Sequence, residues 1–189
     1  FERTERRRDP PGGLHMKEQR IFAVSGVKDS GKTTLISRLI PHFKRKGLSV
    51  SVIKHDGHDF IPDVPGTDTY RLRSAGAQGA AVFSGSRAMV IKDDVTVSEK
   101  ELIREFPDAD IIILEGFKYS EYPKVEVVRR EVSSGPVCDP VFLLAVATDL
   151  SPEEFSGKYS GIPVYGLEER EAERLAEYLC FSAQGLKNG

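Results

Sequence analysis

One short segment restricts the possible folds of this chain more than any other. GVKDSGKT, residues 26–33, matches the pattern G-x-x-x-x-G-K-[ST] in full and lies between the apolar run IFAVS (21–25) and a segment with helical spacing. Glycine is needed at both ends because the chain must curl until successive N–H groups point inward, where a β-carbon would obstruct the turn or an approaching anion. The segment therefore predicts a strand, a phosphate-binding loop and a helix, in that order.

The side chains of this loop suit a nucleoside triphosphate bound with magnesium. Lys32 would place an ammonium near the β- and γ-phosphates, and the Thr33 hydroxyl is a ligand for Mg²⁺. The positive end of the following helix would point at the same phosphate oxygens. We expect the nucleotide to contact Gly26, Lys28, Asp29, Ser30, Gly31, Lys32, Thr33 and Thr34.

The rest of the chain alternates between short apolar runs and helical patterns. Strands are expected at 21–25, 48–54, 110–116, 124–129 and 141–148, and helices over 35–43, 67–77, 101–106 and 167–179. Two further strand-like runs, 80–84 and 88–92, predict a hairpin around Gly85. This order predicts an α/β fold: a P-loop, doubly wound, mostly parallel sheet with an added β-hairpin.

The domain division follows from the ends of the pattern. Residues 16–189 are expected to form a single nucleotide-binding domain, and the Arg-, Pro- and Gly-rich residues 1–15 a disordered tail or an expression remnant. Inside the first helix, Pro41 predicts a kink that costs about 3 kcal/mol unless packing compensates, and Gly47 is well placed to end the helix.

Composition limits the classes of partner. The 189 residues carry a formal net charge of −2, so no overall field would draw the protein to nucleic acid or to an acidic membrane. Cys138 and Cys180 are the two cysteines, and no signal peptide or apolar run of about 18 residues is present. We expect a cytoplasmic protein without a disulfide framework, without nucleic acid and without membrane contact.

Two carboxylates follow expected strands of the sheet and are candidates for magnesium and catalysis. Glu115 ends the apolar run IIIL and would lie at the sheet edge beside the phosphates. Asp56 follows the second strand, where it would order Mg²⁺ or the attacking water, or would serve as a solvated turn residue. The predicted metal ligands are Thr33, Asp56 and Glu115, and the predicted catalytic groups are Asp56 and Glu115.

The polar loop after the second strand leaves several alternatives open. His55, His58, Asp59 and Asp63 could converge on a transition metal, contact the nucleotide or a partner's ligand, or be ordinary loop residues. DVPG (63–66) resembles a regulatory GTPase motif but stands in the wrong chain order. We interpret it as a loop that leads into a helix with Thr67 as its N-cap.

A candidate guanine-binding group follows the last long strand. The usual NKxD motif is missing, but Thr148 and Asp149 stand where it would fall. A carboxylate there accepts both hydrogen bonds from the N1–H and N2–H₂ edge of guanine, which adenine does not offer. Asp149 is therefore the predicted guanine reader, with Thr148 beside it, and strand-end capping is the alternative.

Four ordered blocks, GVKDSGKTTL, IKHDGHDF, DVPGTDTYRLRSAGA and ILEGFK, resemble the molybdopterin-guanine dinucleotide biosynthesis adapter family, MobB. The resemblance covers about residues 20–180. It implies a homodimeric adapter that binds GTP and Mg²⁺, has weak or no GTPase activity, and assists the guanylyltransferase that attaches GMP to molybdopterin. Molybdopterin itself is a possible ligand. On this resemblance the site falls on Gly31, Lys32, Thr33, Glu115 and Asp149.

Two features depart from related dimeric P-loop proteins. Val27 stands where a lysine would reach across the dimer, with Lys28 one position later, and no arginine has the positional signature of an arginine finger. Other functions stay open: a small-molecule kinase with Arg71, Arg73 and Arg87 in a lid, a nickel-insertion type GTPase, or a binding module without turnover.

Overall fold

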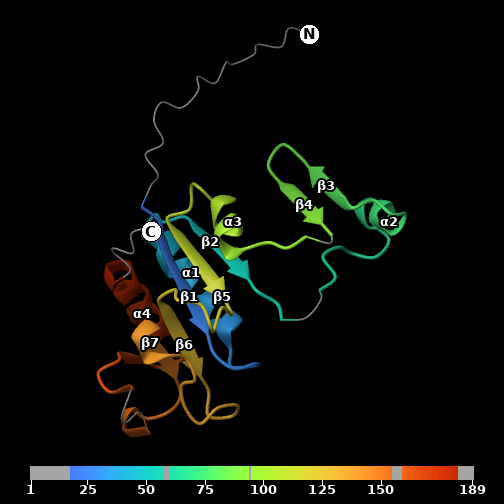
Figure 1. Cartoon of the computed structure of the whole chain (residues 1–189). Coiled ribbons are helices and arrows are strands. Elements are labelled where there is room, and N and C mark those ends of the chain that lie inside the picture. Colours follow the sequence, from blue (N-terminus) through green and yellow to red (C-terminus); the bar gives the residue numbers. More distant parts are fainter. Residues whose placement is uncertain (1–17, 58–59, 94, 155–158, 183–189) are drawn as a thin grey trace.

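The fold is a parallel sheet covered by helices. A computed structural model describes residues 18–57, 60–93, 95–154 and 159–182, and Figure 1 shows the main sheet with a small green hairpin standing apart from it. The α/β class and the added hairpin, both predicted from the sequence, are confirmed. Residues 1–15, the predicted tail, lie outside the described residues, and the predicted domain bounds stay a prediction.

Within the described residues, the main sheet has six strands in the order β2-β5-β1-β6-β7-β8, and all neighbours pair in parallel. All five residues of β5 and of β6 are buried, as expected for strands covered on both faces. Because the strands are parallel, their carboxyl ends meet along one edge. The bounds are β1 Arg20–Ser25, β2 Val50–Lys54, β5 Ile111–Glu115, β6 Lys124–Val128, β7 Leu143–Thr148 and β8 Val164–Tyr165.

Two long helices, α1 (Lys32–Arg45) and α4 (Glu169–Ser182), cover one face of the sheet. Alternate strand residues, such as Phe22 and Val24 of β1, point to this face and pack on Leu39 of α1 and Leu175 of α4. Because this layer holds most of the buried apolar side chains, it fixes α1 and the loop before it against the sheet.

Helix α1 runs through Pro41 and ends as predicted. The helix is not interrupted at the proline, and the next two residues, His42 and Phe43, are both buried. The N–H of Gly47 donates to Lys44 O (3.0 Å), and Gly47 has a φ of 76°, the left-handed conformation that glycine adopts most easily.

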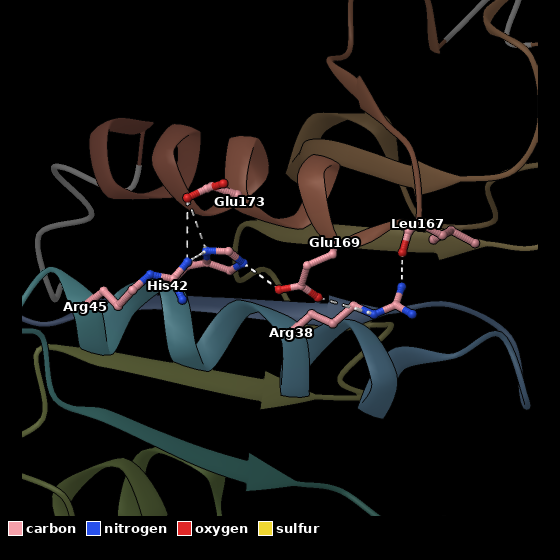
Figure 2. A network of polar contacts seen from close by, with 6 residues as sticks. All are labelled: Arg38, His42, Arg45, Leu167, Glu169 and Glu173. Carbon is pink, nitrogen blue, oxygen red and sulfur yellow. Dashed lines mark hydrogen bonds and ion pairs between the residues drawn. The ribbon is translucent and has the colours of Figure 1, made fainter.

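A polar network joins α1 to α4 (Figure 2). The His42 ring, only 5% exposed, contacts Glu169 Oε1 through Nε2 (3.0 Å) and lies 3.8 Å from Glu173 Oε1 through Nδ1. Arg45 contacts the same Glu173 carboxylate (3.6 Å), and Arg38 contacts Glu169 (3.9 Å). This network fixes the packing of the two helices on the solvent side of their apolar contact.

The opposite face is covered by a short helix and a loop. Helix α3 (Glu99–Arg104) starts with a reciprocal capping box between Ser98 and Glu101. Phe117 and Tyr122, from the loop that joins β5 to β6, pack on the second cluster of buried residues, which includes Leu114. The β5–β6 connection therefore crosses this face without a long helix.

Helix α2 (Asp68–Ser74) and the hairpin of β3 (Gly79–Phe83) and β4 (Ala88–Lys92) form what we call the arm. Thr67 is the N-cap of α2, accepting a hydrogen bond from the Tyr70 N–H, so its predicted role is confirmed. Arg73 donates two hydrogen bonds to Asp93 (2.7 and 2.5 Å), which tie α2 to the end of the hairpin. Several apolar side chains of the arm are exposed.

The strand expected at 141–148 was predicted two residues too long. Pro140–Phe142 form a 3-10 turn, η1, and β7 begins at Leu143. The Asp139 carboxylate accepts from the Val141 N–H (3.1 Å), and Pro140 stands at the start of the turn, so local capping is favoured over strand pairing. Strand β8 and the 3-10 turn η2 (Pro152–Glu154) were not predicted.

Among the described residues, no helix combines the length and the apolar character needed to span a bilayer.

Candidate functional site

The loop between β1 and α1 adopts the curled conformation expected of an anion-binding loop. Gly26, Asp29 and Gly31 have φ values of 140°, 60° and 93°. A β-carbon on Gly26 would lie 2.4 Å from Val127 O, far inside contact distance, so the loop needs glycine there. A β-carbon on Gly31 would meet only the Arg129 Cδ, at 3.6 Å, so the backbone conformation itself favours glycine at that position.

Helix geometry leaves donors at this loop. The first hydrogen bond of α1 runs from the Leu35 N–H to Gly31 O (3.0 Å), so the N–H groups of residues 31–34 have no acceptor within the helix. In the described part of the chain, the Ser30 Oγ is buried and has no hydrogen-bond partner. The loop therefore presents several donors in one place, and phosphate oxygens are acceptors that fit them.

The Lys32 ammonium lies over the same loop. It donates to Val27 O at 2.6 Å and lies 3.4 Å from Gly26 O. Burial lowers the pKa of Lys32, while the negative charges of Glu115 and Asp29 act in the opposite direction. These carbonyl groups thus hold the lysine beside the loop amides. A bound phosphate would replace them as the hydrogen-bond partner of the ammonium.

Strand pairing brings two of the three predicted magnesium ligands into contact. Val24 of β1 pairs with Glu115 of β5, which places the carboxylate beside the first turn of α1. The Thr33 Oγ1 donates to Glu115 Oε1 at 2.6 Å, and Glu115 is only 6% exposed. A hydroxyl and a carboxylate are oxygen donors of the kind that Mg²⁺ prefers, so this pair fits the ion.

Asp56, the other predicted acid, lies at the same edge on an exposed loop. The strand β2 ends at Lys54, and the His55 N–H donates to Glu115 O (3.0 Å), which holds the start of this loop to β5. The proposed role of Asp56 with Mg²⁺ or water stays a prediction.

The alternative metal site in the same loop gains no support. His58 and Asp59 lie outside the described residues, and within the described residues no group of three or more His, Cys, Asp or Glu side chains is placed to hold a metal ion. The Asp63 Oδ1 instead accepts from the Val64 N–H (2.8 Å) and the Thr67 hydroxyl (3.0 Å), which orders the entry to α2.

Asp149 lies on the other side of the phosphate loop, beyond β6. It follows β7 and is exposed, and its Oδ1 accepts from the Arg130 N–H (2.8 Å). Because each carboxylate oxygen accepts more than one hydrogen bond, this contact positions the group and leaves acceptor capacity for guanine. The Thr148 hydroxyl is buried and accepts from the Leu150 N–H (2.9 Å), which caps the strand end. Both nucleotide-binding roles stay predictions.

An ion pair supports the loop that positions Asp149. The Arg130 guanidinium donates two hydrogen bonds to Glu154, at 2.9 and 2.6 Å. This contact lowers the pKa of Glu154 to about 2.

Two cations at the site were missed by the sequence analysis. Lys54, the last residue of β2, pairs in register with Glu115, and its Nζ lies 3.6 Å from Glu115 Oε1. Arg129, directly after β6, packs beside Gly31 and forms an ion pair with Glu131 (2.5 Å). Both residues stand at the carboxyl end of a parallel strand, which is where binding residues gather in such sheets. This signal was present in the sequence, but the strand order was needed to show which other residues they lie beside.

Two shallow hollows flank the turn after Glu115. One, of about 520 Å³, is lined by residues that include Lys118, Lys124 and Phe142, and the other, of about 390 Å³, by residues that include His55 and Phe117. The buried Lys124 ammonium donates to the Lys118 and Ser120 carbonyls, so it anchors the turn. Neither hollow contains the phosphate loop.

The carboxyl ends of the strands therefore form an ordered row. From β2 to β7 they bring Lys54, Glu115, the phosphate loop, Arg129 and Asp149 to one edge, toward which the arrowheads in Figure 1 point. Candidate magnesium ligands lie on one side of the loop and the candidate base reader on the other. This is the arrangement that an extended nucleotide needs.

Comparisons with known proteins identify relatives of this chain. The model of the family described as molybdopterin guanine dinucleotide synthesis protein B, MobB, matches residues 21–149. A molybdopterin-guanine dinucleotide biosynthesis adapter protein of Haemophilus influenzae is 34% identical over 133 residues, which cover 68% of this chain and 74% of the relative. The adapter protein of the same description from Escherichia coli is 35% identical over 140 residues, covering 69% and 78%.

The similarity extends to a solved structure. The crystal structure of Bacillus subtilis MobB matches with a TM-score of 0.67 and 26% sequence identity, covering 85% of this chain and 97% of that one.

Proposed function

Because the chain belongs to the MobB family, as its four sequence blocks predicted, we propose that it is an adapter of molybdopterin-guanine dinucleotide biosynthesis that holds GTP and Mg²⁺ at the phosphate loop. Its proposed partner is the guanylyltransferase that attaches GMP to molybdopterin, and its proposed compartment is the cytoplasm. The nucleotide would lie along the row of strand ends, with the triphosphate on the loop.

The observation that carries the proposal is the contact between Thr33 and Glu115, at 2.6 Å, beside the free donors of the loop. On binding, the amides of residues 31–34 and the Lys32 ammonium would hold the β- and γ-phosphates. Mg²⁺ would take the Thr33 hydroxyl as a ligand and Glu115 directly or through water, neutralising phosphate charge. The hydrogen bond between these two side chains would then be replaced by contacts with the ion.

Selectivity for guanine would come from Asp149. Its carboxylate accepts two hydrogen bonds from guanine, whereas adenine presents an acceptor at N1 and would leave the carboxylate facing that acceptor. The Arg130 N–H, which donates to Asp149 Oδ1 at 2.8 Å, would hold the carboxylate in position.

Slow hydrolysis is the expected behaviour. Phosphoryl transfer depends on positioning the attacking water and on stabilising charge in the transition state. Arg129 lies beside Gly31 but is paired with Glu131, and Asp56 is on an exposed loop. The proposed role of the bound nucleotide is therefore to serve the partner enzyme.

The arm is the proposed homodimer contact. Within the described residues, β3 and β4 form a two-stranded sheet, so each has an edge without a neighbouring strand. The hairpin also exposes apolar side chains, among them Phe83, which is 83% exposed. Free strand edges and exposed apolar groups favour pairing with a second copy. A monomeric mass in light scattering would contradict this contact.

Isothermal titration with Mg-GTP and Mg-ATP tests the proposed function. We expect micromolar binding of GTP and no measurable binding of ATP, and loss of GTP binding in Lys32→Ala. Lys46→Ala is the matched control, because Lys46 lies just after α1 and pairs with Glu177 (4.0 Å), away from the loop. Preference for ATP would favour a kinase, and no binding of either nucleotide would leave a binding module without a nucleotide.

A further inference from the structure

A second lysine occupies the magnesium side of the site. Lys54 ends β2 directly opposite Glu115 of β5, and its Nζ lies 3.6 Å from Glu115 Oε1. The lysine side chain is 57% exposed, whereas Glu115 is buried. The carboxylate is thus fixed in the sheet, while the ammonium stands on a flexible stem at the edge.

One oxygen of Glu115 serves two partners. Glu115 Oε1 accepts from the Thr33 hydroxyl at 2.6 Å and also attracts the Lys54 ammonium. Lys32 lies near the same two charges. Burial lowers its pKa most, the negative charge of Glu115 raises it, and the positive charge of Lys54 lowers it further. Both ammonium groups therefore feel the charge of this carboxylate, but Lys54 is the one that pairs with it.

The position of Lys54 identifies the part of the nucleotide that it would meet. Magnesium bridges the β- and γ-phosphates in P-loop sites, and its candidate ligands are Thr33 and Glu115. Asp149, the candidate base reader, follows β7 on the other side of the loop. Lys54 therefore lies at the terminal-phosphate end of the row.

We propose that Lys54 is a terminal-phosphate ligand: its ammonium leaves Glu115 when Mg-GTP binds and contacts the γ-phosphate, so that the site binds GTP more tightly than GDP. This inference rests on the proposed function. Once Glu115 faced Mg²⁺, the ion would repel the ammonium, and the γ-phosphate, which keeps excess negative charge beside Mg²⁺ and Lys32, would become its partner. The exposed four-carbon stem lets the ammonium move without a change in β2.

The competing role for Lys54 is neutralisation of Glu115 before the nucleotide arrives. In that case the ammonium competes with Mg²⁺ for the carboxylate, and its removal would strengthen the binding of GTP and GDP or leave both unchanged. A contact with the γ-phosphate predicts instead a loss that is confined to the triphosphate. The two roles thus differ in the ratio of the two affinities.

The experiment is isothermal titration of Mg-GTP and Mg-GDP into the wild type, Lys54→Gln, Lys54→Arg and the control Lys46→Gln. We expect Lys54→Gln to weaken GTP binding about 10- to 100-fold, as for loss of a hydrogen bond between charged groups, and GDP binding by less than about threefold. Lys54→Arg keeps the charge and should recover most of the GTP affinity. Lys46→Gln should match the wild type, because Lys46 only pairs with Glu177.

An equal change for both nucleotides in Lys54→Gln, or tighter GTP binding, would overturn the role of Lys54 and leave the proposed function intact. Absence of GTP binding in the wild type would overturn both. Thermal unfolding of Lys54→Gln without nucleotide checks that the variant is folded, and only a small loss of stability is expected, because the replaced ammonium lies at the exposed edge of the sheet.

Discussion

Replacing Gly26 with alanine should destabilise the protein far more than the same change at Gly47. Both glycines have positive φ values, 140° and 76°, so alanine is strained at either position, by about 1–3 kcal/mol. At Gly47 the new methyl group meets no atom within 4 Å, and strain is the whole effect. At Gly26 it would lie 2.4 Å from Val127 O and 2.8 Å from the Ser30 Oγ.

The extra contact at Gly26 adds an overpacking penalty of about 1–3 kcal/mol, because Val127 O belongs to a buried strand and cannot move away easily. The expected loss for Gly26→Ala is therefore about 2–6 kcal/mol, against about 1–3 kcal/mol for Gly47→Ala. Urea unfolding of both variants without nucleotide measures the difference. Equal free energies of unfolding would refute the steric argument and the observed curl of the loop.

Three further changes test other parts of the account. Asp149→Asn should weaken GTP binding at least about 100-fold, because two hydrogen bonds to a charged acceptor are altered. The variant should bind xanthosine triphosphate instead, because the 2-carbonyl of xanthine accepts a hydrogen bond from the new amide. Isothermal titration with both nucleotides measures the two affinities. Arg130→Gln should raise the pKa of Glu154 from about 2 toward its ordinary value of 4.5. Since the lowered pKa stabilises the fold above pH 4.5 and this contribution disappears as pH falls toward 2, melting temperatures of wild type and variant should converge over that range. His42→Ala should lower the free energy of unfolding by about 1–3 kcal/mol, since it leaves the contact with Glu169 unmade and a gap between α1 and α4.

For each of these three substitutions, one result would contradict the predicted effect. Asp149→Asn with unchanged GTP binding would remove the assigned reader. A difference between Arg130→Gln and wild type that is constant from pH 7 to pH 2 would show that Glu154 is not the titrating group. For His42, the control is Arg174→Ala, which breaks the pair between the exposed Arg174 guanidinium and Glu171 (2.7 Å) and should cost less than about 1 kcal/mol. Similar losses for both variants would contradict the structural role of the network.

The sequence predicted the phosphate loop well because its determinants are local. The two glycines, Lys32 and Thr33 lie within eight residues, and the flanking periodicities identify the strand and the helix. Glu115 was found because the end of a buried parallel strand must lie at the binding edge. Its contact with Thr33, at 2.6 Å, places two of the predicted metal ligands side by side.

The missed features depend on which strands are neighbours. Lys54 meets Glu115 only because β2 pairs with β5, and Arg129 lies beside Gly31 only because β6 pairs with β1. Chain order alone does not determine these neighbours. The late start of β7, at Leu143, had a local cause, the capping by Asp139 before Pro140, which the apolar spacing of 141–148 concealed.

The central claim is that main-chain amides at the start of α1 capture the phosphates of Mg-GTP. Amide chemical shifts of ¹⁵N-labelled protein, recorded during titration with Mg-GTP, test it most directly. The account predicts that the largest shifts fall on the amides of residues 31–34, with smaller ones at Glu115 and Asp149. Unchanged amide signals for residues 31–34 at millimolar Mg-GTP would contradict it.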